Sequence, residues 1–128
     1  MPIINIDEEA INEVADACHR NSVSKGFWDD QKMENGALSR ELVRISIPEK
    51  LALIHSEVSE ALEDYRDKKM DTETNRETGK PEGFPSELAD VVIRCFDLAG
   101  ALKIDLGSEI AQKMRYNATR PHKHGKVC

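Results

Sequence analysis

The chain carries two short acidic motifs of the same form, each with two carboxylates three residues apart. Glu57 and Glu60 stand in "EVSE", and Glu87 and Asp90 stand in "ELAD". A helix turns by about 100° per residue, so this spacing puts both acids of a motif on one side of a helix. Four carboxylates around one small volume repel one another unless cations neutralise them. Ligation by oxygen alone favours Mg²⁺ or Mn²⁺.

The second motif stands in an apolar segment, which weighs against a purely solvated role for its acids. In "GFPSELADVVIRCFDLAG", little polar surface remains around Glu87 and Asp90. A single Glu-x-x-Glu pair on a surface helix is usually solvated, and an ion pair between Asp90 and Arg94 would need no metal. That ion pair leaves Glu87 without a partner, so we favour a metal site. Zinc is disfavoured because no cysteine or histidine stands in a ligand-like cluster.

Four helices are expected to position these acids. Their periodicity and end signals place the first at 5–23, with Asp7 as N-cap, and the second at 46–69, starting with Ser46 or Ile47 before Pro48. The third starts at Pro85 or Ser86 and ends near Gly100, and the fourth runs from Asp105 or Ser108 to Arg120. Residues 24–46 are predicted to be irregular or briefly helical, and residues 70–83 to form an exposed loop. Strand signals are nearly absent. We therefore predict an all-α helical bundle, with the third helix at its centre because it is apolar around most of its circumference.

Charge and composition exclude several classes of protein. The net charge of −6 disfavours binding to a nucleic-acid polymer, although divalent cations can bridge acidic side chains to a single nucleotide. Cys18, Cys95 and Cys128 are widely spaced and odd in number, so no disulfide framework is expected. We expect neither a signal peptide nor a membrane-spanning segment, because the first residues lack a basic region followed by an apolar one and the longest apolar runs are short. We expect one cytoplasmic domain over residues 1–128, with a tail over about 120–128.

The order and spacing of three segments resemble MazG-like nucleotide pyrophosphohydrolases. These segments are "KLALIHSEVSEALEDYR", "ELADVVIRCFDLAGALKIDL" and "KMRYNATRPHKHGK", which cover most of the chain. Such enzymes belong to the all-α NTP pyrophosphatase superfamily, with the dimeric dUTPases and the dCTP pyrophosphatases.

The resemblance implies both a fold and an activity. The fold is a four-helix-type bundle whose core is completed in a homodimer or homotetramer. The activity is Mg²⁺-dependent cleavage of a nucleoside triphosphate to the monophosphate and pyrophosphate, and its implied role is cleaning of the nucleotide pool. One of the glutamates would orient or deprotonate the attacking water. The metal ligands and catalytic residues implied by the resemblance are Glu57, Glu60, Glu87 and Asp90.

The last predicted helix carries a polar stripe. Lys113, Tyr116, Asn117 and Arg120 follow a helical spacing that puts them on one face. The stripe fits a polyphosphate, with Arg120 suited to paired oxygens, and equally fits a basic helix end that complements its own dipole. The family resemblance favours phosphate binding by these residues.

Trp28 is the natural candidate for stacking on a nucleobase. The alternative is a core residue that plugs one end of the bundle. In relatives similar to dCTP pyrophosphatase, a histidine and a tryptophan nine residues apart line the base pocket, and His19 and Trp28 have that spacing here. The resemblance therefore implies base binding by these two residues.

Two other functions are compatible with the same pattern. One is a non-catalytic helical module that dimerises through the third helix and holds its acids in ion pairs. The other is a related pyrophosphohydrolase that acts on a phosphoribosyl-nucleotide.

Overall fold

The computed structural model describes residues 4–29, 33–34, 37–38 and 40–122, with the backbone alone described at 33–46. Helices dominate these residues: α1 (Glu8–Ser24), α2 (Arg40–Arg66), α3 (Phe84–Leu102) and α4 (Leu106–Thr119). Two short antiparallel hairpins pair β1 (Met33–Glu34) with β2 (Ala37–Leu38), and β3 (Glu73–Thr74) with β4 (Pro81–Glu82). The predicted all-α class is confirmed.

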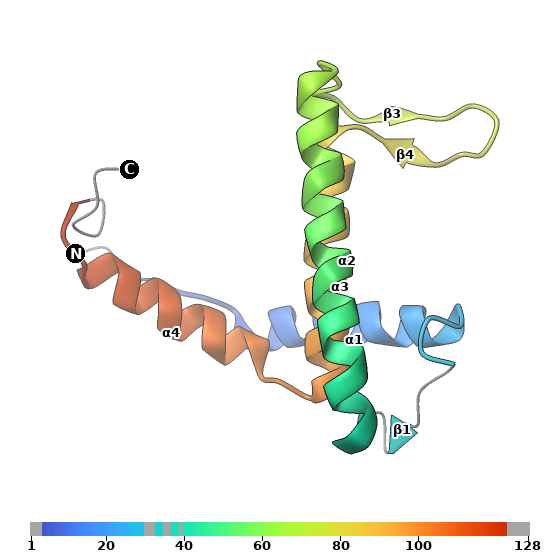
Figure 1. Cartoon of the computed structure of the whole chain (residues 1–128). Helices are drawn as coiled ribbons and strands as arrows, with labels where there is room; N and C mark the ends of the chain where they lie inside the picture. The colour runs from blue at the N-terminus through green and yellow to red at the C-terminus, as the bar shows by residue number, and fades with distance from the viewer. Residues whose placement is uncertain (1–3, 30–32, 35–36, 39, 123–128) are drawn as a thin grey trace.

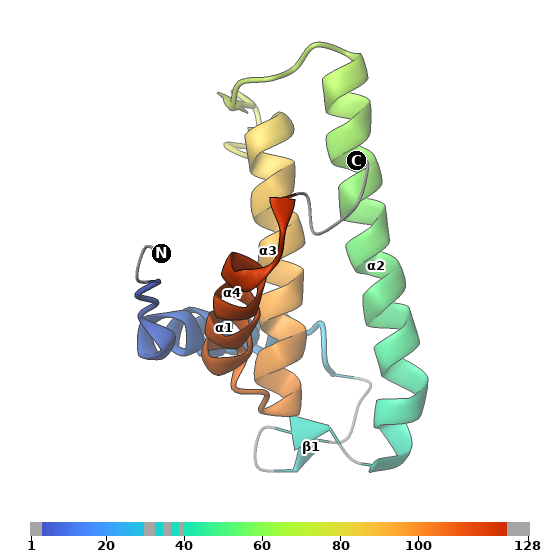
Figure 2. The same ribbon diagram turned by 90° about the vertical axis from the view of Figure 1, so that its left-hand side faces the viewer.

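Helix α3 lies at the centre of the arrangement. It packs against α2 and against α1, while α4 packs against α1. Helices α2 and α3 run antiparallel and side by side, and α1 crosses α3 near its carboxyl end (Figure 1 and Figure 2). The β3–β4 hairpin projects from the opposite end of the α2–α3 pair. The central position predicted for the third helix is therefore confirmed.

Local capping signals set the beginnings of two helices. Asp7 caps α1 by accepting a hydrogen bond from the Ala10 amide at 3.0 Å. Asp105 caps α4 by accepting one from the Ser108 amide at 3.0 Å. Each carboxylate satisfies an amide that has no partner within the helix and complements the positive end of the helix dipole. The predicted cap at Asp7 is confirmed, and of the two alternative starts for the last helix Asp105 is the right one.

Helix α2 begins earlier than the sequence predicts. The expected start at Ser46 or Ile47 makes Pro48 an early helical residue, whereas the helix begins at Arg40 and contains Pro48 in its interior. An interior proline removes one backbone hydrogen bond. The helix nevertheless continues through this position, since the surrounding structure can override a local propensity. The prediction of an irregular or only briefly helical segment over 24–46 is therefore wrong at 40–46, which belong to a helix of 27 residues.

The segment between α2 and α3 contains the β3–β4 hairpin where the sequence predicts a plain loop. Gly83 ends this hairpin with φ of 117°, and a Cβ there would collide with the carbonyl oxygen of Asp71. Only glycine fits this position. The Phe84 amide donates to the Lys69 carbonyl oxygen at 2.9 Å, which ties the beginning of α3 to the chain leaving α2. Glu87 is thereby held in the first turn of α3.

Small side chains make up most of the buried core. A Cβ added at Gly100 would lie 2.7 Å from the Cβ of His19, so α1 and α3 approach closely at this point. The buried apolar residues are Ala15, Trp28, Ala61, Ala99, Ala101 and Ala111. Larger apolar side chains remain exposed on α2 and α3, among them Leu51, Val58, Leu62, Tyr65, Leu88, Val92 and Ile93. A single copy of the chain thus leaves an apolar surface on its two longest helices uncovered.

The structure tests only some of the predictions about the chain as a whole. None of the helices in the described residues combines the length and the hydrophobicity that a bilayer crossing requires. The predicted tail at about 120–128 lies mostly outside the described residues, which end at 122. A single domain over 1–128 and a cytoplasmic location stay predictions.

Candidate functional site

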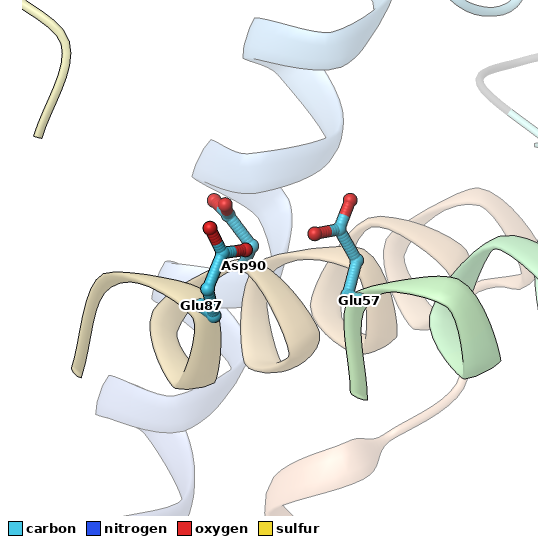
Figure 3. A group of neighbouring side chains, drawn as sticks. All are labelled: Glu57, Glu87 and Asp90. Carbon is cyan, nitrogen blue, oxygen red and sulfur yellow. The ribbon is translucent and has the colours of Figure 1, made fainter. Parts of the chain in front are cut away.

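Carboxylates from both acidic motifs converge between α2 and α3. Glu57 lies in α2, and Glu87 and Asp90 lie near the beginning of α3. One carboxylate oxygen from each of the three lies within 4.8 Å of those from the other two. Figure 3 shows the three side chains projecting to the same side of the two helices. The spacing of three residues within "ELAD" aligns Glu87 with Asp90, and the packing of α2 on α3 adds Glu57.

The cluster is shielded from water at Glu57 and Glu87. Glu57 is only 8% exposed. The Oε2 atom of Glu87 is buried and has no hydrogen-bond partner among the described residues. A buried carboxylate oxygen without a donor or a cation is costly. A cation bound beside Glu87 would therefore supply the partner that the described side chains do not give its Oε2 atom.

Burial and neighbouring carboxylates raise the pKa values of Glu87 and Asp90. Burial raises the pKa of Glu87 to about 7, and a hydrogen bond with Glu60 and the charges of Glu60, Asp90 and Glu57 add to the rise. Burial also raises the pKa of Asp90, together with the charge of Glu57, while Lys80 and Arg94 act in the opposite direction. Two carboxyl groups hydrogen-bond each other only when one holds a proton. Without a metal ion, Glu87 therefore keeps its proton to a higher pH than an ordinary glutamate does.

Glu60 stands beside the cluster at its solvent side. Its residue is exposed, and it lies outside the group of three that shares a 4.8 Å limit. Its hydrogen bond and its charge nevertheless act on Glu87. Of the four acids that the sequence singles out, the structure brings three together and places the fourth next to Glu87.

Arg94 pairs with Glu57 in the other helix. Its Nε donates to Glu57 Oε1 at 2.7 Å, a short charge-assisted hydrogen bond. The sequence offers Asp90, four residues earlier on the same helix, as the partner for Arg94. The guanidinium charge opposes the rise in the pKa of Asp90, but the hydrogen bond of Arg94 goes to Glu57. Arg94 thus pairs with Glu57 and acts on Asp90, while no interaction between Arg94 and Glu87 is found.

A cavity of about 410 Å³ opens beside the cluster. Such a volume is typical of small-molecule sites. Glu57, Asp90 and Arg94 lie on its wall, and the polar groups farther along include the Lys50 ammonium and the Asp97 carboxylate. Its remaining lining residues are Cys18, Asn21, Ser22, Phe27, Leu53 and Ile93. The cavity therefore combines an acidic wall with two cations and one exposed aromatic ring.

The two residues predicted to bind a base are buried in the core. His19 is 8% exposed and Trp28 is 2% exposed. Both contact Asp97: His19 Nδ1 lies 2.8 Å from its Oδ1, and Trp28 Nε1 donates to the same oxygen at 3.0 Å. The Lys50 ammonium lies 4.1 Å from the centre of the Trp28 ring. In the single chain Trp28 thus holds the position of a core residue, which is the alternative to base stacking.

Phe27 is the aromatic side chain on the wall of this cavity, and it is 63% exposed. Sequence reasoning does not separate it from Trp28, because the two rings are adjacent and only the tertiary fold decides which one turns inward. Asp97 has a readable signal, since Asp90, Arg94 and Asp97 follow one helical stripe with spacings of four and three residues. Lys50 has no comparable signal.

The polar stripe on α4 does not reach the cavity within one chain. Lys113, Tyr116 and Asn117 are exposed, and α4 packs against α1. Arg120 lies over the Tyr116 ring, with its guanidinium carbon 5.7 Å from the ring centre. These four described residues are absent from the lining of the cavity. Phosphate binding by the stripe stays a prediction.

The fold and the site define an all-α chain with a carboxylate cluster at the edge of a cavity. Comparison with protein families, with curated proteins and with solved structures finds no match to this chain. The assignment of a function therefore depends on the motifs and on the chemistry of the site.

Proposed function

We propose that this chain is a Mg²⁺-dependent nucleoside triphosphate pyrophosphohydrolase of the MazG-like kind. It converts a nucleoside or deoxynucleoside triphosphate to the monophosphate and pyrophosphate, in a nucleotide-pool-cleaning role. One observation carries the proposal: carboxylates from both acidic motifs converge within 4.8 Å beside a cavity of about 410 Å³. The order and spacing of the motifs support the same activity.

The donor set fits a hard divalent cation. Only oxygen ligands come together in the cluster, and the buried Oε2 of Glu87 has no other partner among the described residues. Mg²⁺, or Mn²⁺ in its place, would be held by Glu57, Glu87 and Asp90, with Glu60 at the solvent side. When bound, the ion neutralises phosphate oxygens and polarises water.

The acids of the chain supply the rest of the reaction. Water adds to a phosphorus atom of the triphosphate while the phosphoanhydride bond breaks, releasing the monophosphate and pyrophosphate. The attacking water loses one proton. In this proposal a glutamate at the edge of the cluster accepts this proton as a general base.

Pyrophosphate release tests the proposal. The purified chain is incubated with a panel of dNTPs, NTPs, damaged nucleotides and phosphoribosyl-nucleotides, with Mg²⁺ or with EDTA. Glu60→Gln and Asp90→Asn should abolish turnover and leave the helical circular dichroism intact. Glu63→Gln is the matched control, since Glu63 lies on α2 in an exposed ion pair with Arg66 at 2.6 Å. Metal-independent turnover, or wild-type rates in the Asp90 variant, would refute the site.

We also propose that the bundle is completed by a second copy of the chain, as a homodimer or a homotetramer. The buried core is built mainly from alanines, and alanine buries little apolar area. The exposed Val58, Leu62, Leu88 and Val92 lie on the two helices that flank the acid cluster. Exposed apolar side chains on two neighbouring helices are typical of an interface that a second chain covers.

A non-catalytic dimerisation module is the second candidate. The ion pair between Arg94 and Glu57 favours it, because that pair partly neutralises the cluster without any metal. A Mg²⁺ titration separates the two candidates. Ions that bind only the folded state raise the melting temperature. A melting temperature unaffected by Mg²⁺ would favour the module over the enzyme.

A further inference from the structure

The Arg94 guanidinium is hydrogen-bonded through its Nε atom, while its side chain is partly exposed on the wall of the cavity. Its Nε donates to Glu57 Oε1 at 2.7 Å, and the Glu57 side chain is 11% exposed. The buried carboxylate therefore anchors the inner side of the guanidinium. The Arg94 side chain itself is 35% exposed and lies on the wall of the cavity. Its two terminal nitrogens make no hydrogen bond to the described part of the chain.

An arginine anchored in this way is prepared for an anionic ligand. The guanidinium is planar, stays charged and offers several donors in a fixed geometry that matches phosphate oxygens. The hydrogen bond through Nε leaves the Nη donors for another partner. Because Glu57 already restricts the side chain, binding costs less conformational entropy than it would for a free surface arginine.

The position of Arg94 couples it to the acid cluster. Its partner Glu57 belongs to the three carboxylates within 4.8 Å of one another, and its charge acts on Asp90. A phosphate bound beside a cation in that cluster would therefore lie next to the guanidinium. The stripe on α4, which the sequence favours for phosphate, is absent from the same cavity.

We propose that Arg94 binds an anionic oxygen of the phosphate chain through its Nη atoms, with Glu57 as its anchor. This inference rests on the proposed function for its choice of substrate. It assigns to Arg94, rather than to the α4 stripe of the same chain, the main contact between protein and phosphate outside the metal ligands.

The experiment measures binding of a phosphate chain without a base. The probe is imido-bridged inorganic triphosphate, which resists hydrolysis, titrated calorimetrically into the full-length protein with saturating Mg²⁺. Arg94→Gln should weaken binding by about 10- to 100-fold, the range of a hydrogen bond between charged groups. The affinity of Arg94→Lys for triphosphate should lie between those of wild type and Arg94→Gln, because lysine keeps the charge but loses the paired Nη donors. Lys113→Gln, in the α4 stripe, should change binding by less than about threefold.

Arg66→Gln is the matched control, because it removes an arginine from an exposed ion pair with Glu63 on the same helix as Glu57. It should leave triphosphate binding unchanged. Circular dichroism and the Mg²⁺-induced rise in melting temperature report whether the Arg94 variants keep the fold and the metal site.

Four results decide between the possible roles of Arg94 and test the proposed function. Weaker triphosphate binding with an unchanged Mg²⁺ requirement supports the inference. Unchanged triphosphate binding in Arg94→Gln overturns it, even if that variant needs more Mg²⁺, since Arg94 would then only position Glu57. A wild-type chain that does not bind the probe overturns it as well. A wild-type chain that binds the probe through Arg94 but releases no pyrophosphate from any nucleotide would refute the proposed function alone.

Discussion

Removing the proton-binding group Glu87 should change how stability depends on pH. The Glu87 pKa is about 7 in the folded chain against 4.5 as its ordinary value, so the folded state binds more protons than the unfolded state between these values. Below pH 4.5 the carboxyl group is protonated in both states and costs nothing. As pH rises toward 7, the unfolded chain ionises first, and the free energy of unfolding falls.

The size of this fall follows from the shift in pKa. A rise from 4.5 to about 7 corresponds to about 3 kcal/mol at full strength. Solvent reaches part of the Glu87 side chain and screens its charge, which reduces the expected effect to about 1–2 kcal/mol. For a chain of 128 residues this is a change of about 4–8 °C in melting temperature. Mg²⁺ should cancel the fall, because the bound cation stabilises the ionised carboxylates.

The assay is urea unfolding followed by circular dichroism from pH 5 to pH 8, at one protein concentration, in EDTA and in Mg²⁺. In EDTA, wild type should lose about 1–2 kcal/mol more than Glu87→Gln across this range. At pH 8 the variant should be the more stable of the two and should gain nothing from Mg²⁺. The comparison removes the contributions of groups common to both proteins, and Glu63→Gln controls for the loss of an acid elsewhere on the helix pair. Equal pH dependence in wild type and Glu87→Gln would refute the reasoning about the cluster.

Three further substitutions test the fold. Val92→Asp places a charge on the exposed apolar face of α3, so it should dissociate the proposed oligomer, as light scattering would measure; an unchanged mass would place the interface elsewhere. Asp7→Ala removes the N-cap of α1 and should lower the free energy of unfolding by about 1 kcal/mol, with no change contradicting a role for the cap. Gly83→Ala forces a side chain into a backbone with φ of 117° and against a carbonyl oxygen, so it should cost about 1–3 kcal/mol in urea unfolding. Wild-type stability in that variant would mean that the hairpin relaxes freely.

Interactions between near neighbours in the chain are readable without coordinates. Asp7 and Asp105 cap helices through amides three residues away. The sequence identifies the cap at Asp7, and it narrows the start of the last helix to Asp105 or Ser108. The pairing of Glu87 with Asp90 on one face follows from the same helical geometry. The apolar circumference of the third helix likewise predicts its central position.

Contacts between helices depend on how far each helix is shifted and rotated against its neighbour. The spacing of Arg94 fits a bond to Asp90, yet the packing of α2 on α3 brings Glu57 to its Nε instead. Adjacent rings at Phe27 and Trp28 differ only in which one faces the core. Each of these outcomes sums many small packing contacts that no short motif encodes. Spacing along the chain therefore identifies the acidic residues of the site. The packing of the helices against one another decides which residues these acids contact and where the cavity forms.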